Sequence, residues 1–177
     1  MTPPSLPFFL FLVVVLILER LLELRAAKRN TARLLAEGAR EYGAKHYPVI
    51  VTMHVAFFIS LIVEFYLRRA SLGRYWQVGL VVFILAQALR LWSRRSLSGR
   101  WTARVIVIPG ERLVARGPYA RIPHPIYIAV ALELFSIPFI FALYYTCIIF
   151  SILNACTLLL VRIPCENKAL ATAVRKR

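Results

Sequence analysis

The stretch Ile126–Val161, IYIAVALELFSIPFIFALYYTCIIFSILNACTLLLV, decides the fold of this chain. It contains 36 residues and a single charged side chain, Glu133. As one helix it would extend about 54 Å at ~1.5 Å per residue, whereas the hydrocarbon core of a bilayer is only ~30 Å thick. The stretch is therefore predicted to fold back as a helical hairpin, with its turn either at Pro138 or at Tyr144–Thr146.

Three further apolar runs precede this hairpin along the chain. They are Leu6–Leu18, extendable to Leu24, then Tyr47–Leu67 and Tyr75–Trp92, and each approaches the ~20 residues that a transmembrane helix needs. The first run has no basic residue before it and no small-residue cleavage site after it, which indicates a retained span and not a signal peptide. We therefore predict an all-α membrane protein with five transmembrane helices.

The composition favours the same class of protein. Hydrophobic residues make up 60% of the chain, charged residues only 18%, and the mean hydropathy is +0.68. A soluble domain is about half apolar and about a quarter charged, so a soluble globular protein, a disordered chain and a disulfide-built module are all disfavoured. The three cysteines, Cys147, Cys156 and Cys165, are too widely spaced to form a metal signature, and no metal site is predicted.

The basic residues set the predicted orientation, because 23 Lys and Arg face only eight acidic residues and the net charge is +15. Six lie in the first loop, eight around the third loop and five in the tail, but only three lie in the second loop and none in the hairpin turn. The protein is thus predicted in the inner (cytoplasmic) membrane. The positive-inside rule places its N-terminus outside and its C-terminus on the cytoplasmic side.

The same charge has consequences for partners. The polar segment Ala26–Ala44 is expected to lie on the cytoplasmic interface as an amphipathic helix, where its basic side chains meet anionic headgroups of membrane lipids. No stacking-aromatic or groove-helix pattern accompanies the charge, so no nucleic acid is expected as a partner. The sequence predicts no particular oligomeric state.

Two charged residues inside the predicted spans are candidates for chemistry, since a charge within the bilayer needs a partner or a cavity. Arg90 lies at the cytoplasmic end of the third span, where it either reaches the headgroups or faces the bundle to hold an anionic substrate group. Glu133 lies two turns into the fourth span, as either a structural hydrogen-bond hub or a site residue.

The third loop, Ser93–Pro125, is too long to be only a connector. It contains a β-like run, Val105–Ile108, a turn at Pro109-Gly110, and finally Pro123-His124-Pro125. A residue before proline is kept out of the helical region and proline suits the first turn of a helix, so His124 is predicted at the N-terminus of the fourth span. The alternative for His124 is an interfacial histidine without a role.

The tail returns to the same side of the membrane as this histidine. With five spans, Arg162 and Glu166 of the tail lie at the same end of the bundle as His124 and Arg90. The sequence therefore predicts a cytoplasm-facing site that opens sideways to lipid.

At these residues the chain resembles the isoprenylcysteine carboxyl methyltransferase family of integral membrane enzymes. The segment Gly117–Tyr127, GPYARIPHPIY, is similar to the family's G-x-Y…R-H-P-x-Y signature, and Arg162–Leu170, RIPCENKAL, is similar to its R-I…E-[EN]-x-A-L tail. Gln87–Arg90 and Trp101 fit the family's span end and loop entry. The resemblance covers about half of the chain, from Ala86 to Leu170.

The chain departs from the family pattern at three positions. Pro123 stands where an arginine usually precedes His-Pro, Asn167 replaces the second acidic residue of the tail, and Pro164 follows Ile163. If the missing arginine braces the loop in relatives, Arg121 is the residue that would replace it here.

The resemblance implies S-adenosylmethionine as methyl donor, bound in a pocket that the cytoplasmic loop and the C-terminal tail build. Glu166 would hold a polar or cationic part of the cofactor, and Arg162 would brace Glu166 or pair with the cofactor's carboxylate. Arg90 would face the methyl acceptor, and Glu133 or His124 would remove the proton of a hydroxyl acceptor. The residues implied to line the cofactor site are His124, Pro125, Tyr119 and Tyr127.

The chain is thus expected to form one membrane domain, residues 1–177, with a variable part at 1–85 and a catalytic part at 86–177. The expected reaction moves a methyl group to a carboxylate or hydroxyl of a lipophilic small molecule, an isoprenoid or polyketide-like acid or enol. Two alternatives remain: an NADPH-dependent membrane reductase of the sterol-reductase type, and a non-enzymatic transporter or assembly factor in which Glu64 and Glu133 line a polar path.

Overall fold

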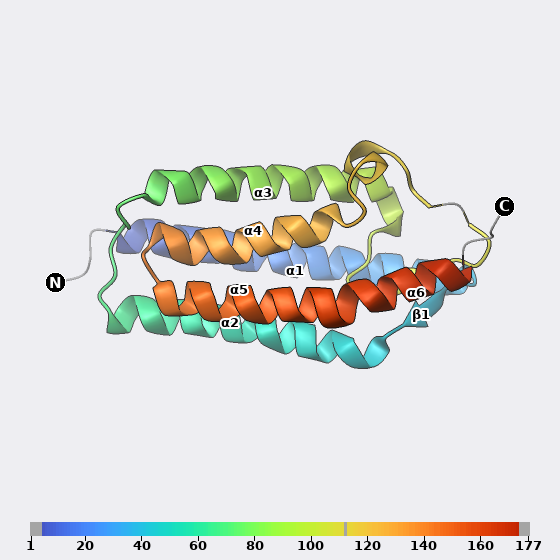
Figure 1. The fold of residues 1–177 in the computed structure, drawn as a ribbon, viewed down its shortest axis with the longest axis horizontal. Helices are drawn as coiled ribbons and strands as arrows, with labels where there is room; N and C mark the ends of the chain where they lie inside the picture. The colour runs from blue at the N-terminus through green and yellow to red at the C-terminus, as the bar shows by residue number, and fades with distance from the viewer. Residues whose placement is uncertain (1–4, 112, 174–177) are drawn as a thin grey trace.

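A computed structural model describes residues 5–111 and 113–173 (Figure 1). The helices are α1 (Leu6–Ala36), α2 (Tyr47–Leu67), α3 (Trp76–Leu97), α4 (Pro125–Ile140), α5 (Tyr144–Cys156) and α6 (Ile163–Ala173). Two short strands, β1 (Arg40–Tyr42) and β2 (Val105–Val107), pair antiparallel. The chain is therefore mostly helical, as predicted. Arg112, Arg175, Lys176 and Arg177, which contribute to the predicted charge pattern, lie outside the described residues.

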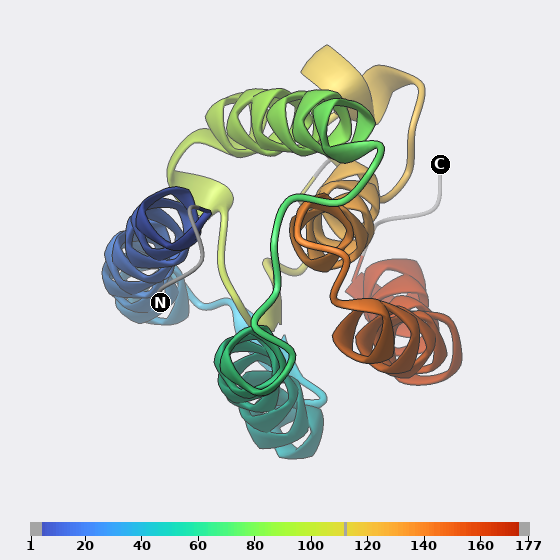
Figure 2. The same ribbon diagram turned by 90° about the vertical axis from the view of Figure 1, so that its left-hand side faces the viewer.

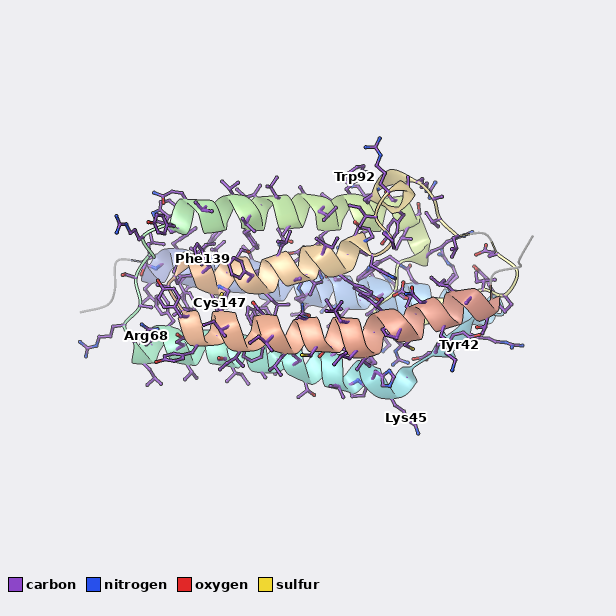
Figure 3. All side chains as sticks on the ribbon, viewed as in Figure 1. Tyr42, Lys45, Arg68, Trp92, Phe139 and Cys147 are labelled. Carbon is purple, nitrogen blue, oxygen red and sulfur yellow. The ribbon has the colours of Figure 1, made fainter. Side chains whose placement is uncertain are left out.

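The helices α1 to α5 run side by side, and Figure 2 shows them end on. Three continuous helical stretches, Ala44–Leu67, Trp76–Arg100 and Tyr144–Thr172, are long and apolar enough to cross a membrane. Large apolar side chains are exposed along α1, α2, α3 and α5, and Trp92 points outward from α3 (Figure 3). Such a belt is stable only against lipid, and these are features of an integral membrane protein.

The stretch Ile126–Val161 does fold back on itself, and its turn lies between the two predicted positions. Pro138 stays inside α4, and its carbonyl accepts a hydrogen bond of 2.9 Å from the amide of Leu143. Ala142 adopts a left-handed φ of 52° in this turn, and α5 begins at Tyr144.

The hairpin is fixed by a carboxylate from a neighbouring helix. Glu64 of α2 accepts hydrogen bonds from the backbone amides of Tyr145 and Thr146, at 3.2 and 2.7 Å, in the first turn of α5. A helix N-terminus has unpaired amides and attracts negative charge, so Glu64 caps α5. Arg68, labelled in Figure 3, pairs with the same carboxylate at 3.2 Å. The negative charge of Glu64 at this end of the bundle is therefore compensated.

Three regions follow one another along the length of the bundle: an apolar core, a set of buried charges and a cavity. The half that contains the α4–α5 turn holds an apolar core in which Phe9 stacks on Phe65 and Phe141 packs edge-on against both rings. A set of buried charges follows in the middle. At the other end, the two strands, α6 and the third loop enclose a cavity.

The prediction of a separate helix at Ala26–Ala44 is wrong, although residues 26–36 are helical. The first helix does not end at its charged residues but continues without a break to Ala36, and residues 40–42 form β1. No glycine or proline interrupts the sequence between Pro7 and Gly38, so the helix has no local reason to stop. The charges at Glu19, Arg20 and Glu23 find partners inside the bundle and need no exit to water.

The β-like run in the third loop is confirmed as β2, and the turn at Pro109-Gly110 follows it. Its partner, β1, comes from the first loop, with Glu41 opposite Ile106. The pairing ties the segment between α1 and α2 to the loop between α3 and α4, and it closes one wall of the cavity.

Candidate functional site

The start of α4 and the segment that joins α5 to α6 meet at one polar cluster. The Tyr127 hydroxyl donates a hydrogen bond to Glu166 and accepts one of 3.0 Å from Nε of Arg162. His124 Nδ1 lies 3.7 Å from Glu166 Oε1, and its ring stacks on Tyr127 with centroids 5.3 Å apart. The predicted meeting of the Pro-His-Pro segment with the C-terminal glutamate is therefore present.

Local sequence explains how these side chains are aimed. α4 begins at Pro125, so His124 precedes the first helical residue, with φ −130° and ψ 60°, outside the helical region. On the other side, Pro164 has no amide hydrogen to donate to the carbonyl four residues earlier, and the chain widens to a π-helix over Thr157–Arg162. This change of helical period sets the direction of Arg162.

Arg162 links this cluster to the third loop. It is 7% exposed, and its Nη2 donates a 2.9 Å hydrogen bond to the Ala103 carbonyl just before β2. The guanidinium thus spans Tyr127 on α4 and the backbone of the loop, a fork that a lysine cannot reproduce.

An open cavity of about 680 Å³ lies beside the cluster. Its size falls within the ~300–1,000 Å³ common for small-molecule sites. One wall is apolar and comes from β2 and the residues around it, and Trp101 also lines the cavity, with the guanidinium of Arg94 over its ring. The cluster residues on its surface are Tyr119, His124, Tyr127, Arg162, Glu166 and Asn167.

Of the six predicted cofactor-site residues, five line this cavity, and Pro125 is buried at the start of α4 without lining it. Tyr119 lies in a short 3-10 helix, Gly117–Ala120, that packs on the end of α3. Burial and the nearby Glu166 charge raise the pKa of the Tyr119 hydroxyl above its usual range, so Tyr119 is a neutral hydrogen-bonding group.

Two of the departures from the family pattern also lie at the cavity. Asn167 Oδ1 lies 3.1 Å from His124 Nε2, so the amide that replaces an acid contacts the histidine directly. Pro123 lines the cavity as well. Arg121, the expected replacement for the missing arginine, is exposed and is not among the cavity's wall residues.

The two predicted catalytic residues, Arg90 and Glu133, lie together but not on this cavity. Arg90 is 7% exposed, and its Nη1 donates to Glu133 at 3.1 Å. Glu133 also binds Nη2 of Arg20 at 2.5 Å through both carboxylate oxygens. Glu133 follows Tyr127 by six residues, which places it about 9 Å deeper along α4 at ~1.5 Å per residue.

Sequence reasoning missed the α1 members of this buried ion network. Glu23, 3% exposed, accepts hydrogen bonds from Nε and Nη2 of Arg90 at 2.9 and 2.8 Å and from Arg94 at 2.8 Å, and it also pairs with Arg20. One sequence signal pointed to it: Arg20 and Glu23 follow directly on an apolar run, where a charge needs a partner. That the helix continues past them was not visible.

The network also reaches one turn toward the apolar core. Gln87 donates a 2.8 Å hydrogen bond to Glu19 of α1. The network residues are Glu19, Arg20 and Glu23 of α1, Gln87, Arg90 and Arg94 of α3, and Glu133 of α4. Three arginines and three glutamates balance, so the network carries no net charge.

Comparisons with known proteins show the family of this chain. The model of the isoprenylcysteine carboxyl methyltransferase (ICMT) family matches residues 77–172, which include α3, the third loop and the α4–α6 region. This family is one of membrane methyltransferases, and the chain belongs to it.

Two bacterial relatives extend the similarity. The uncharacterized protein YpbQ of Bacillus subtilis (strain 168) is 41% identical over 162 residues, covering 92% of this chain and 96% of the relative. An uncharacterized protein of Haemophilus influenzae (strain ATCC 51907 / DSM 11121 / KW20 / Rd) is 27% identical over 108 residues, covering 61% of this chain and 63% of that protein. No solved structure matches significantly.

Proposed function

We propose that the protein is an S-adenosylmethionine-dependent methyltransferase that acts on the carboxylate or hydroxyl of a lipophilic molecule dissolved in the membrane. The observation that carries the proposal is the cluster of His124, Tyr127, Arg162 and Glu166 beside a cavity of about 680 Å³, in a chain of a methyltransferase family. A cavity with a largely apolar wall, which includes the exposed Leu113, suits an acceptor that comes from the bilayer.

The side chains around the cavity suit the cofactor chemically. S-adenosylmethionine supplies a methyl group already activated on a sulfonium, and it also carries an ammonium, a carboxylate and a flat aromatic base. Glu166 is suited to the cationic part, and Arg162 and His124 are suited to the carboxylate. The apolar wall at Val105–Ile108 and the ring of Trp101 are suited to the base.

The chain's own contribution is binding, orientation and exclusion of water. A carboxylate acceptor is nucleophilic without a base, so the protein would need only to desolvate and align it. A hydroxyl acceptor would need proton removal, for which His124 lies at the cavity. Arg90 and Glu133, predicted at the acceptor, would act from the bilayer side, since they lie deeper along the bundle than Tyr127.

A calorimetric titration of purified protein in nanodiscs with S-adenosylhomocysteine tests the cofactor assignment. Binding of this ligand without binding of NADPH is the expected result. Binding of NADPH alone would favour a reductase and contradict the proposal. Binding of neither, together with no thermal shift near saturating ligand, would favour the non-enzymatic alternative. Incubation with methyl-labelled S-adenosylmethionine and a total lipid extract, followed by identification of the labelled product, then names the acceptor.

We further propose that α1 to α5 are five spans of the inner membrane, with the N-terminus outside and the cavity on the cytoplasmic side. The basic residues around the cavity end support this orientation, because they would meet anionic headgroups there. Cysteines engineered at Lys45 and Ser71, which are exposed near opposite ends of α2, test it in a background without the three native cysteines. An impermeant reagent on intact cells should label the second position alone, and labelling of the first alone would reverse the orientation.

A further inference from the structure

One residue in the wall of the cavity, Trp101, is held from α1, which lies outside the residues that the family model matches. Trp101 is 8% exposed and lines the cavity. Its carbonyl accepts a 2.8 Å hydrogen bond from Nδ2 of Asn30 on α1. Its ring lies under the guanidinium of Arg94, whose Cζ is 4.5 Å from the ring centroid.

Arg94 is in turn fixed by α1. Its Nη1 donates to Glu23 at 2.8 Å, and Glu23 is its one acidic partner within residues 5–111 and 113–173. Its Nε is buried and has no hydrogen-bond partner among the same residues, so the contact with Glu23 and the contact with Trp101 determine where the guanidinium lies. Two residues of α1, seven positions apart, thus hold Trp101 by its ring and by its backbone.

A purely stabilising role does not account for this arrangement. Charges buried in a membrane protein are costly, and a well-packed apolar set of the same volume is often at least as stable as a buried ion network. What this series of contacts provides is a fixed geometry. The Glu23 carboxylate orients the planar guanidinium of Arg94, which in turn stacks on the flat ring of Trp101. The last residue in this series, Trp101, lines the cavity.

We propose that Glu23, Arg94 and Asn30 are positioning residues that fix Trp101 in the wall of the cavity and so set the affinity of the cavity for the cofactor. The proposal rests on the proposed function only in naming the ligand. It makes α1 a part of the site, although the family signature lies in α3 to α6.

The test uses Trp101 as the reporter in full-length protein carrying Trp76→Phe and Trp92→Phe. Glu23→Gln keeps the side-chain shape but removes the charge that holds Arg94. We expect the emission of Trp101 to shift to longer wavelength, its acrylamide quenching to rise, and the affinity for S-adenosylhomocysteine to fall roughly tenfold, as for the loss of one charged hydrogen bond. Glu19→Gln is the matched control, because Glu19 lies one turn away on the same helix and bonds Gln87 instead.

Three further variants keep the test informative if Glu23→Gln does not insert. Asn30→Ala removes the backbone tether outside the ion network and is expected to move the same two readouts in the same direction. Arg94→Lys, which keeps a cation at the ring, is expected to change both less than Arg94→Gln. If Trp101 emission in Glu23→Gln and Asn30→Ala matches that of Glu19→Gln, or if it shifts while affinity is unchanged, the positioning role is wrong.

The positioning role and the proposed function fail in different ways. If the parent protein binds no S-adenosylhomocysteine, the cofactor assignment is wrong, but the emission and quenching of Trp101 still report whether α1 holds the wall. If the parent binds S-adenosylhomocysteine and Glu23→Gln and Asn30→Ala bind it equally well, the cofactor assignment stands and the positioning role of α1 is wrong.

Discussion

The buried ion network and the cluster at the cavity use the same kinds of side chain in opposite ways. In the network, Arg90 donates from all three nitrogens to Glu23 and Glu133, and the three side chains are less than 10% exposed. At the cavity, the Glu166 side chain is 28% exposed and that of His124 is 15% exposed. A buried set of charges that pair with one another fixes helices, whereas a partly open set keeps capacity to bind a ligand.

The difference also predicts how each cluster responds to substitution. Removing one partner from a buried, paired network leaves an uncompensated charge in a medium of low dielectric, which the bundle cannot easily solvate. Removing one side chain at an open cavity lets water take its place. Substitutions in the network should therefore act first on stability, with an added effect on affinity at Glu23 and Arg94, which hold Trp101. Substitutions at the cavity should act on ligand affinity.

The largest effect is expected from Glu133→Ala. It removes the carboxylate that joins Arg20 and Arg90 across α1, α3 and α4. Loss of one partner of a buried ion pair typically costs about 3–5 kcal/mol. We therefore expect a strongly lowered unfolding midpoint, measured by thermal unfolding in detergent, and low yield of folded protein.

Glu37→Ala is the control for this loss of a carboxylate. Glu37 also pairs with an arginine, Arg33, at 3.6 Å, but both side chains are more than half exposed. A pair of this kind contributes about 0.3–0.5 kcal/mol on a helix, so its removal should barely move the midpoint. Equal midpoints for the two variants would show that the network does not stabilise the bundle.

The second prediction concerns the open cluster. Glu166→Gln should leave the unfolding midpoint nearly unchanged and weaken S-adenosylhomocysteine binding by about tenfold to hundredfold, since a hydrogen bond to a charged group contributes about 1.5–3 kcal/mol. Calorimetry measures the affinity, and His124→Ala should move it in the same direction. Lys168→Gln, at an exposed position two residues away that does not line the cavity, is the control. Unchanged affinity in both cavity variants would remove these residues from the cofactor site.

Much of the open cluster was predictable because its determinants are local. The bounds of α2 equal the apolar run Tyr47–Leu67, and the length of Ile126–Val161 alone requires a hairpin. Counting spans then brings the tail back to the start of α4. Proline on either side of His124 fixes where that helix begins, so the meeting of His124 with Glu166 followed from chain length and proline geometry.

The closed network was not predictable in the same way, because its determinants are distant in the sequence. Glu23 and Arg90 are 67 positions apart, and Arg20 and Glu133 are 113 apart. Read locally, Arg20 and Glu23 mark the end of a span, since a charge normally leaves the hydrocarbon. Only the packing of three helices shows that they are neutralised inside the bundle, which is why α1 continues to Ala36. The strand β1 was missed for the same reason, since its partner lies in another loop.

A smaller effect is expected at Arg162, which lines the cavity but is as buried as Arg90 of the network. Arg162 bridges Tyr127 and the Ala103 carbonyl. Arg162→Lys keeps the charge but cannot reach both groups, so about one hydrogen bond is lost. We expect roughly tenfold weaker cofactor binding with a small loss of stability, measured by calorimetry and thermal unfolding on the same samples. A large fall in the unfolding midpoint with unchanged affinity would place Arg162 with the closed network instead.

The smallest effect is expected from Tyr119→Phe, which sharpens the comparison by removing a neutral group from the open cluster. Burial and Glu166 raise the pKa of the Tyr119 hydroxyl, so the group keeps its proton from about pH 6 to about pH 9 in the parent protein. Its removal therefore takes away at most one neutral hydrogen bond, which corresponds to an affinity loss of about threefold to tenfold that is the same at every pH in that window. Affinity measured across the window should give parallel profiles for parent and variant. Profiles that diverge with rising pH would mean that Tyr119 titrates, and that the cavity stabilises its anion in spite of the neighbouring glutamate.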